Sequence, residues 1–145
     1  MLGRLILARP HMSLWDGPRL AWWLTSSCGI RGAVFPVDPD YARHPLYRRL
    51  LAQYGKWVGR HSMVPMDSES PFALRWLLRD LQHGRTVVLF PQGTGLDNPM
   101  RPDRPGAQWL IQRAQPEVLE ISMGRTIAFA GPDHVRAQAT SPLGV

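Results

Sequence analysis

The segment from Ser70 to Phe90 constrains the fold more than any other part of the sequence. Ser70 and Pro71 suit the N-cap and first position of a helix, leucines then recur at the spacing of one helix face, and Gly84 suits the helix end. Thr86–Phe90 follows as a short apolar run of the length of a buried strand. A helix followed at once by a buried strand is typical of α/β proteins, whose sheets are covered by helices on both faces.

Strands and helices alternate along the rest of the chain in the same way. Asp16 is placed like the N-cap of a first helix, which Gly29 and Gly32 end. A second helix is expected from Pro45 to Gly55. The other expected elements are strands at residues 5–8, 33–37, within 58–66, at 118–123 and at 126–130, and a helix over 107–114. With 145 residues and 44% apolar content the chain can bury one core, so we expect residues 1–145 to form a single α/β domain with a mostly parallel central sheet flanked by helices.

The chain is basic, and nearly all of its positive charge is carried by arginine. Seventeen basic residues against eleven acidic ones give a formal net charge of +6, which favours anionic partners such as phospholipid headgroups, phosphorylated carriers or nucleic acid. Because the arginines are scattered and no nucleic-acid motif is present, a small basic nucleic-acid-binding protein is only a distant alternative. The single Cys28 excludes an internal disulfide framework. No segment is long and apolar enough to span a bilayer, so we expect a cytoplasmic protein that attaches peripherally to membranes through residues such as Arg19, Trp22 and Trp23.

His11 and Asp16 lie five residues apart across the expected junction between the first strand and the first helix. A turn there can bring an imidazole and a carboxylate together. Histidine can accept the proton of an attacking hydroxyl near neutral pH, and a carboxylate beside it can hold the ring in the correct tautomer. A surface histidine next to a helix-capping aspartate has the same spacing, so the pair by itself leaves both interpretations open.

A second motif, Phe90-Pro91-Gln92-Gly93-Thr94-Gly95, follows the expected buried strand. Its glycines allow backbone N–H groups to face an anion or a developing oxyanion. An ordinary tight turn would have a similar composition. The motif lacks the lysine of a nucleotide phosphate-binding loop and the three spaced glycines of a dinucleotide-binding loop.

Taken together, the two motifs resemble those of the glycerolipid acyltransferase family, which carries an N-H-x4-D block followed by an F-P-E-G-T-R block. The resemblance covers roughly residues 5–130 and extends to 1-acylglycerol-3-phosphate and 2-acylglycerophosphoethanolamine acyltransferases. It implies an acyl-CoA or acyl carrier protein donor, a lysophospholipid hydroxyl as acceptor, and neither metal nor organic cofactor. His11 would be the general base and Asp16 its partner, and Gln92, Gly93 and Thr94 would help to bind the acceptor phosphate.

The sequence departs from the family pattern at several positions. Pro10 replaces the usual asparagine, Gln92 replaces glutamate, and Gly95 and Asp67 stand where phosphatidate-forming members have arginine. Because two charge-assisted phosphate contacts are missing, we expect a phosphodiester acceptor to be preferred over a phosphomonoester unless other arginines reach the site. The candidates for this compensation are Arg60 and Arg101.

The same substitutions leave a second interpretation open, in which a catalytically degenerate homologue binds lipid or acyl carrier without turnover. The chain is also expected to be truncated at one or both ends relative to the family, because it has no room for the N-terminal membrane helices of many members.

Overall fold

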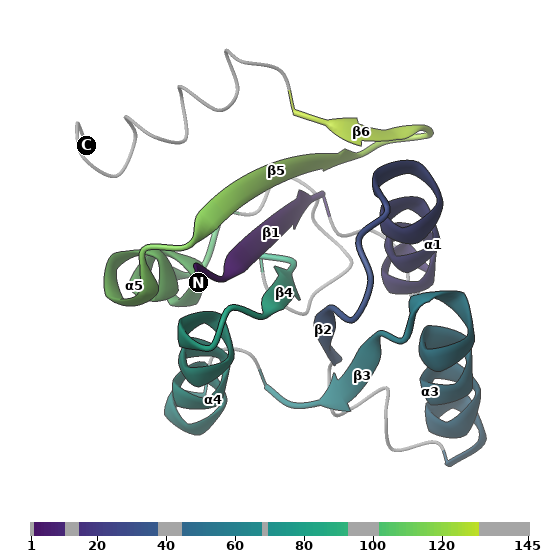
Figure 1. The fold of residues 1–145 in the computed structure, drawn as a ribbon, viewed down its shortest axis with the longest axis horizontal. Coiled ribbons are helices and arrows are strands. Elements are labelled where there is room, and N and C mark those ends of the chain that lie inside the picture. Colours follow the sequence, from purple (N-terminus) through teal and green to yellow (C-terminus); the bar gives the residue numbers. More distant parts are fainter. Residues whose placement is uncertain (1, 11–14, 38–44, 68–69, 93–101, 131–145) are drawn as a thin grey trace.

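A computed structural model of the protein describes residues 2–10, 15–37, 45–67, 70–92 and 102–130. Within these residues the chain forms six strands and four helices (Figure 1). In chain order they are β1 (Arg4–Arg9), α1 (Asp16–Cys28), β2 (Val34–Val37), α3 (Pro45–Gly59), β3 (Ser62–Pro65), α4 (Pro71–Gln82), β4 (Thr86–Leu89), α5 (Pro105–Ala114), β5 (Glu117–Met123) and β6 (Ile127–Phe129). The predicted α/β fold with a mostly parallel sheet is confirmed.

The six strands form one sheet in the order β3-β2-β4-β1-β5-β6. All neighbouring pairs are parallel except β5 and β6, which pair antiparallel. β1 lies between β4 and β5, with Leu5 opposite Val87 on one side and Val118 on the other. Residues 5–8 of β1 are all buried, which is expected of a central strand covered on both faces.

Helices α1 and α3 cover one face of the sheet, and α4 and α5 cover the other (Figure 1). Alternate residues of β1 therefore enter different cores. Ile6 and Ala8 belong to the core formed with α1, whereas Leu5 and Leu7 belong to the core formed with α4 and α5. The result is a sandwich of helices, sheet and helices with two apolar layers.

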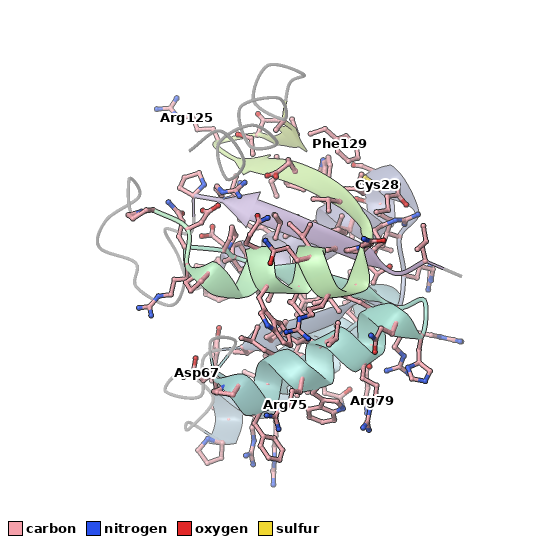
Figure 2. All side chains as sticks on the ribbon, turned by 90° about the vertical axis from the view of Figure 1, so that its left-hand side faces the viewer. Cys28, Asp67, Arg75, Arg79, Arg125 and Phe129 are labelled. Carbon is pink, nitrogen blue, oxygen red and sulfur yellow. The ribbon has the colours of Figure 1, made fainter. Side chains whose placement is uncertain are left out.

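Helix α4 forms as its sequence predicts. The Oγ of Ser70 accepts a hydrogen bond from the backbone N–H of Ala73 at 3.1 Å, and Pro71 is the first helical residue. Leu77 and Leu81 are buried against the sheet, and Gly84 just beyond the helix has a positive φ of 80°. The outer face of α4 carries Arg75 and Arg79, which project away from the domain in Figure 2.

Two predicted helix boundaries are wrong. The N-cap of α1 is Trp15, which makes no side-chain capping hydrogen bond, so Asp16 is the first helical residue and not the cap. Helix α3 continues through Gly55 to Gly59 because these glycines serve packing and not termination. A Cβ at Gly55 would lie 2.9 Å from the carbonyl oxygen of His61, and one at Gly59 would lie 2.3 Å from the Oγ1 of Thr25.

His61 is a buried structural histidine at the junction of α3 and β3. Its Nδ1 accepts a hydrogen bond from the backbone N–H of Ala33 at 3.0 Å, which requires the proton of the neutral ring to lie on Nε2. Nε2 then donates to the Oγ1 of Thr25 at 2.8 Å. Burial, the largest cause, and the nearby charge of Arg31 lower the pKa of His61 below its ordinary value. The ring thus joins α1, the start of β2 and the start of β3 in its neutral form.

Candidate active site

The topology places the strands that precede the two sequence motifs side by side. β1 and β4 are adjacent and parallel, with Leu7 opposite Leu89 near their carboxyl ends. Pro10 follows β1, and Pro91 and Gln92 follow β4, so both segments leave the sheet at the same edge. The described residues next to and within the two motifs, Pro10 and Pro91–Gln92, therefore follow neighbouring strand ends, although they are about 80 residues apart in the sequence.

The same edge is the switch point of the sheet. After β1 the chain passes to α1 on one face and on to β2, whereas after β4 it passes to α5 on the opposite face and on to β5 (Figure 1). The two connections diverge between neighbouring strands, and in open α/β sheets this divergence leaves the crevice in which ligands bind. The fold therefore indicates the β1–β4 edge as the ligand site independently of either motif.

Asp16 is buried in the first turn of α1, with 2% of its surface exposed. Its Oδ1 lies 3.6 Å from Nη1 of Arg19, and its negative charge at a helix N-terminus is favoured by the helix dipole. Arg19 also donates from Nη2 to the carbonyl oxygen of Gly124 at 3.0 Å. The guanidinium thus connects the Asp16 carboxylate with the turn between β5 and β6.

Four of the predicted site residues, His11, Gly93, Thr94 and Arg101, lie outside the described residues. Gln92 is described and is buried, with 7% of its surface exposed. The carbonyl oxygen of the preceding Pro91 accepts a hydrogen bond from the backbone N–H of Arg104 at 2.7 Å, which joins the segment after β4 to the start of α5.

Arg60 does not lie with Asp16 and Gln92. It occupies a left-handed position, with a φ of 57°, between the end of α3 and the start of β3. In a parallel sheet the start of β3 is at the amino edge, whereas Asp16 and Gln92 follow strands at the carboxyl edge. The expectation that Arg60 replaces a missing phosphate contact therefore has no support in the geometry.

Asp67 follows β3 and is at the carboxyl edge, but β2 separates β3 from β4. In Figure 2 Asp67 and Arg125, which follow β3 and β5, lie on the same side of the domain but far apart. Pro10 and Gln92 therefore follow the neighbouring strands β1 and β4, whereas Asp67 follows β3 at the end of the sheet.

An ionic cluster next to the candidate site was not anticipated from the sequence. Arg9, at the end of β1, forms ion pairs with Glu120 on β5 and with Asp103 before α5, the latter with 2.6 Å between Nη2 and Oδ2. Burial disfavours the charged form of Arg9, but the hydrogen bonds that its guanidinium donates to the carboxylates of Asp103 and Glu120 favour it, and the pKa of Arg9 is raised. The sequence feature that indicates such a cluster is Glu120 in the middle of an expected strand, because a buried carboxylate needs a cationic partner.

A broad apolar groove opens beside Asp16, between α1, α3 and the β5–β6 turn. Its volume is about 1130 Å³. We call it the α1–α3 groove; its lining includes Trp15, Arg19, Trp22, Leu50, Trp57 and Arg125. Trp15 directly precedes the candidate carboxylate, so one end of the groove adjoins the candidate active site.

Among the described residues, no helix has the length and apolar character needed to cross a bilayer. Within the same residues, histidine, cysteine, aspartate and glutamate side chains nowhere form a group of three that could hold a metal ion. No known family model matches the sequence.

Proposed function

We propose that the protein is an O-acyltransferase that moves a fatty acyl group from a thioester donor to the hydroxyl of a lysophospholipid-type acceptor. The observation that carries the proposal is that β1 and β4, which lead into the His11–Asp16 segment and the Phe90–Gly95 segment, are neighbours at the switch point of the sheet. The sequence motifs and the ligand position expected for this fold thus indicate the same edge.

In the proposed reaction His11 takes the proton of the acceptor hydroxyl as its oxygen attacks the thioester carbonyl carbon. The tetrahedral intermediate then expels the thiolate, which receives the proton from His11, and the products are an ester and a free thiol. Asp16 acts as a positioning residue that holds the ring and stabilises the imidazolium. The burial of Asp16 at the start of α1 supports this role, because a carboxylate fixed by a helix N-terminus cannot easily turn away.

The segment after β4 is proposed to bind the acceptor phosphate and to stabilise the developing oxyanion through backbone N–H groups of Gly93 and Thr94. Gln92 contributes an amide, which donates hydrogen bonds but carries no charge. A phosphodiester acceptor with a substituted head group therefore fits this segment better than a phosphomonoester. The donor in this proposal is acyl-CoA or acyl carrier protein.

Peripheral attachment to the cytoplasmic side of a membrane is part of the proposal. Trp22 is 59% exposed and Trp57 is 85% exposed, and Arg19 lies beside them along the α1–α3 groove. Exposed tryptophans with a neighbouring arginine are typical of proteins that bind at the membrane interface. Trp23 is not a candidate anchor because it is half-buried and packs edge-on against Phe129, with 5.2 Å between the ring centroids.

The proposal is tested by release of free thiol from acyl-CoA and from acyl carrier protein in the presence of a panel of lysophospholipids. We expect release to require an acceptor and to fall by about 10²–10⁴-fold in His11→Ala. His83→Ala is the matched control, because His83 is exposed at the end of α4 on the other face of the sheet. Asp16→Asn keeps the side-chain volume and should also lower turnover strongly.

Equal turnover in His11→Ala and wild type would contradict the proposed base. If the well-folded wild-type protein releases no thiol with any donor and acceptor, the proposal of an acyltransferase is replaced by that of a non-catalytic lipid-binding protein.

A further inference from the structure

The α1–α3 groove has the chemical character of a site for a hydrocarbon chain. Four of the chain's six tryptophans line it, namely Trp15, Trp22, Trp23 and Trp57. Leu51, which also lines the groove, is buried. The hydroxyl of Tyr54 donates a hydrogen bond to the carbonyl oxygen of Pro18 at 3.0 Å, so the Tyr54 ring is left to form part of the apolar wall.

Large apolar side chains that line the groove are unusually exposed to solvent. Leu50 is 59% exposed and Trp57 is 85% exposed, although both side chains line a concave apolar surface. Contiguous apolar surface of this kind usually marks a binding site. The volume of about 1130 Å³ exceeds the roughly 300–1,000 Å³ typical of small-molecule pockets, which favours a long flexible ligand over a compact one.

One end of the groove is cationic. Arg19 is fixed there by the hydrogen bond to Gly124 and by its approach to Asp16. Arg125 is exposed on the β5–β6 turn, and among the described residues no carboxylate forms an ion pair with it. In Figure 2 the side chain of Arg125 projects away from the domain. An arginine that forms no ion pair within the described part of the chain, at the end of an apolar groove, is complementary to the anionic end of a single-chain amphiphile.

We propose that the α1–α3 groove binds one long hydrocarbon chain with an anionic end, with the chain between α1 and α3 and the anionic group at Arg125 and Arg19. The assignment deepens the proposed function, and it rests on that function for the ligand's role as a substrate: the groove would select long-chain acyl compounds and direct their polar end toward Asp16. The concave part of the groove suits a single bound chain, whereas the exposed rings of Trp22 and Trp57 remain available for the proposed contact with a membrane surface.

Binding is tested directly with stearate that carries a nitroxide near its methyl end, at concentrations at which it is monomeric. A nitroxide held in the groove quenches the fluorescence of nearby tryptophans, and we expect saturable quenching of most of the emission. Trp76 on α4 and Trp109 on α5 belong to the other face and should remain as background. The labelled methyl ester, which lacks the charge, is the matched ligand.

Two variants test the two parts of the groove. Leu50→Glu places a charge in the apolar wall and should weaken stearate and ester alike by at least tenfold. Arg125→Glu should weaken stearate on the order of tenfold or more while changing the ester little, because only stearate has a negative end. Trp76→Glu is the matched control on α4 and should bind both ligands as wild type does. Leu50, Trp76 and Arg125 are all exposed, so their replacement is compatible with folding, which circular dichroism checks.

The outcomes separate this proposal from the proposed function. Unchanged stearate binding in both groove variants, or quenching seen only with nitroxide lipid in vesicles and never with monomeric stearate, would overturn the groove assignment even if thiol release proceeds. Saturable stearate binding that is weakened by Leu50→Glu and Arg125→Glu would support the groove assignment even if no acyl transfer is detected.

Discussion

The neutral, buried His61 predicts a specific loss of stability in mild acid. In the folded state the pKa of the His61 imidazole is lowered from 6.5. Below pH 6.5 this imidazole therefore binds a proton in the unfolded chain but remains neutral in the folded chain. The contribution of His61 is therefore fully present above pH 6.5 and is lost as the pH falls toward the lowered folded-state pKa. A proton on Nδ1 would also face the backbone N–H of Ala33 and break that hydrogen bond.

The size of the effect follows from the unfolded state. One proton changes the free energy of unfolding by at most about 1.4 kcal/mol per pH unit, and integration from pH 6.5 to 5.5 gives at most about 1 kcal/mol. We expect urea unfolding, followed by circular dichroism at several pH values, to show this loss for wild type and for His83→Asn. In His61→Asn the amide oxygen can still accept from Ala33, and the variant should be less stable at neutral pH but lack this component of the pH dependence. If the free energy of unfolding falls equally steeply below pH 6.5 in wild type and His61→Asn, the reasoning is refuted.

Three further predictions concern packing, the ionic cluster and the acceptor. Gly59→Ala should lower the free energy of unfolding by about 1–3 kcal/mol, because the added Cβ would collide with Thr25. Gly17→Ala is the control and should not be destabilising, because nothing lies within 4 Å of its Cβ. Urea unfolding of both variants measures the difference. Arg9→Leu should cost roughly 3 kcal/mol because it leaves the Glu120 carboxylate buried without its partner, and Arg9→Leu combined with Glu120→Leu should recover part of the loss in thermal unfolding. With one donor, a lysophospholipid with a substituted head group should react faster than lysophosphatidic acid, and a strong preference for lysophosphatidic acid would contradict the proposed neutral phosphate site.

The elements that could be predicted are those whose local pattern and tertiary environment agree. Ser70, Pro71 and the leucine spacing define α4 without help from the rest of the chain, and the apolar run of residues 5–8 identifies a strand covered on both faces. The end of α3 could not be predicted, because a glycine such as Gly55 often ends a helix. Here glycine is required because the backbone of His61, six residues later, leaves no space for a Cβ. The start of α1 was misplaced by one residue because aspartate is favoured both as a cap and in the first turn.

The candidate site was partly accessible from the sequence for a similar reason. Asp16 and Gln92 follow predicted strands, so their position at the carboxyl edge depends only on the strands being parallel neighbours. Arg60 was assigned by charge alone, and nothing in its local sequence indicates which edge of the sheet it occupies. The partners of Arg9 lie 94 and 111 residues away in the sequence, and the groove is formed by three separate segments, so neither is visible before the chain is folded.

Arg19 has a further consequence for how the candidate site could respond to its ligand. Its guanidinium touches the Asp16 carboxylate and also holds the carbonyl oxygen of Gly124, the residue before Arg125. A ligand that moves Arg125 would also move the β5–β6 turn. The Arg19 side chain connects that turn to the Asp16 carboxylate, because it contacts both. Ligand binding in the groove would then change the orientation of Asp16 through the Arg19 guanidinium. An Arg19→Met variant should therefore bind stearate more weakly and also lose any dependence of turnover on acyl chain length.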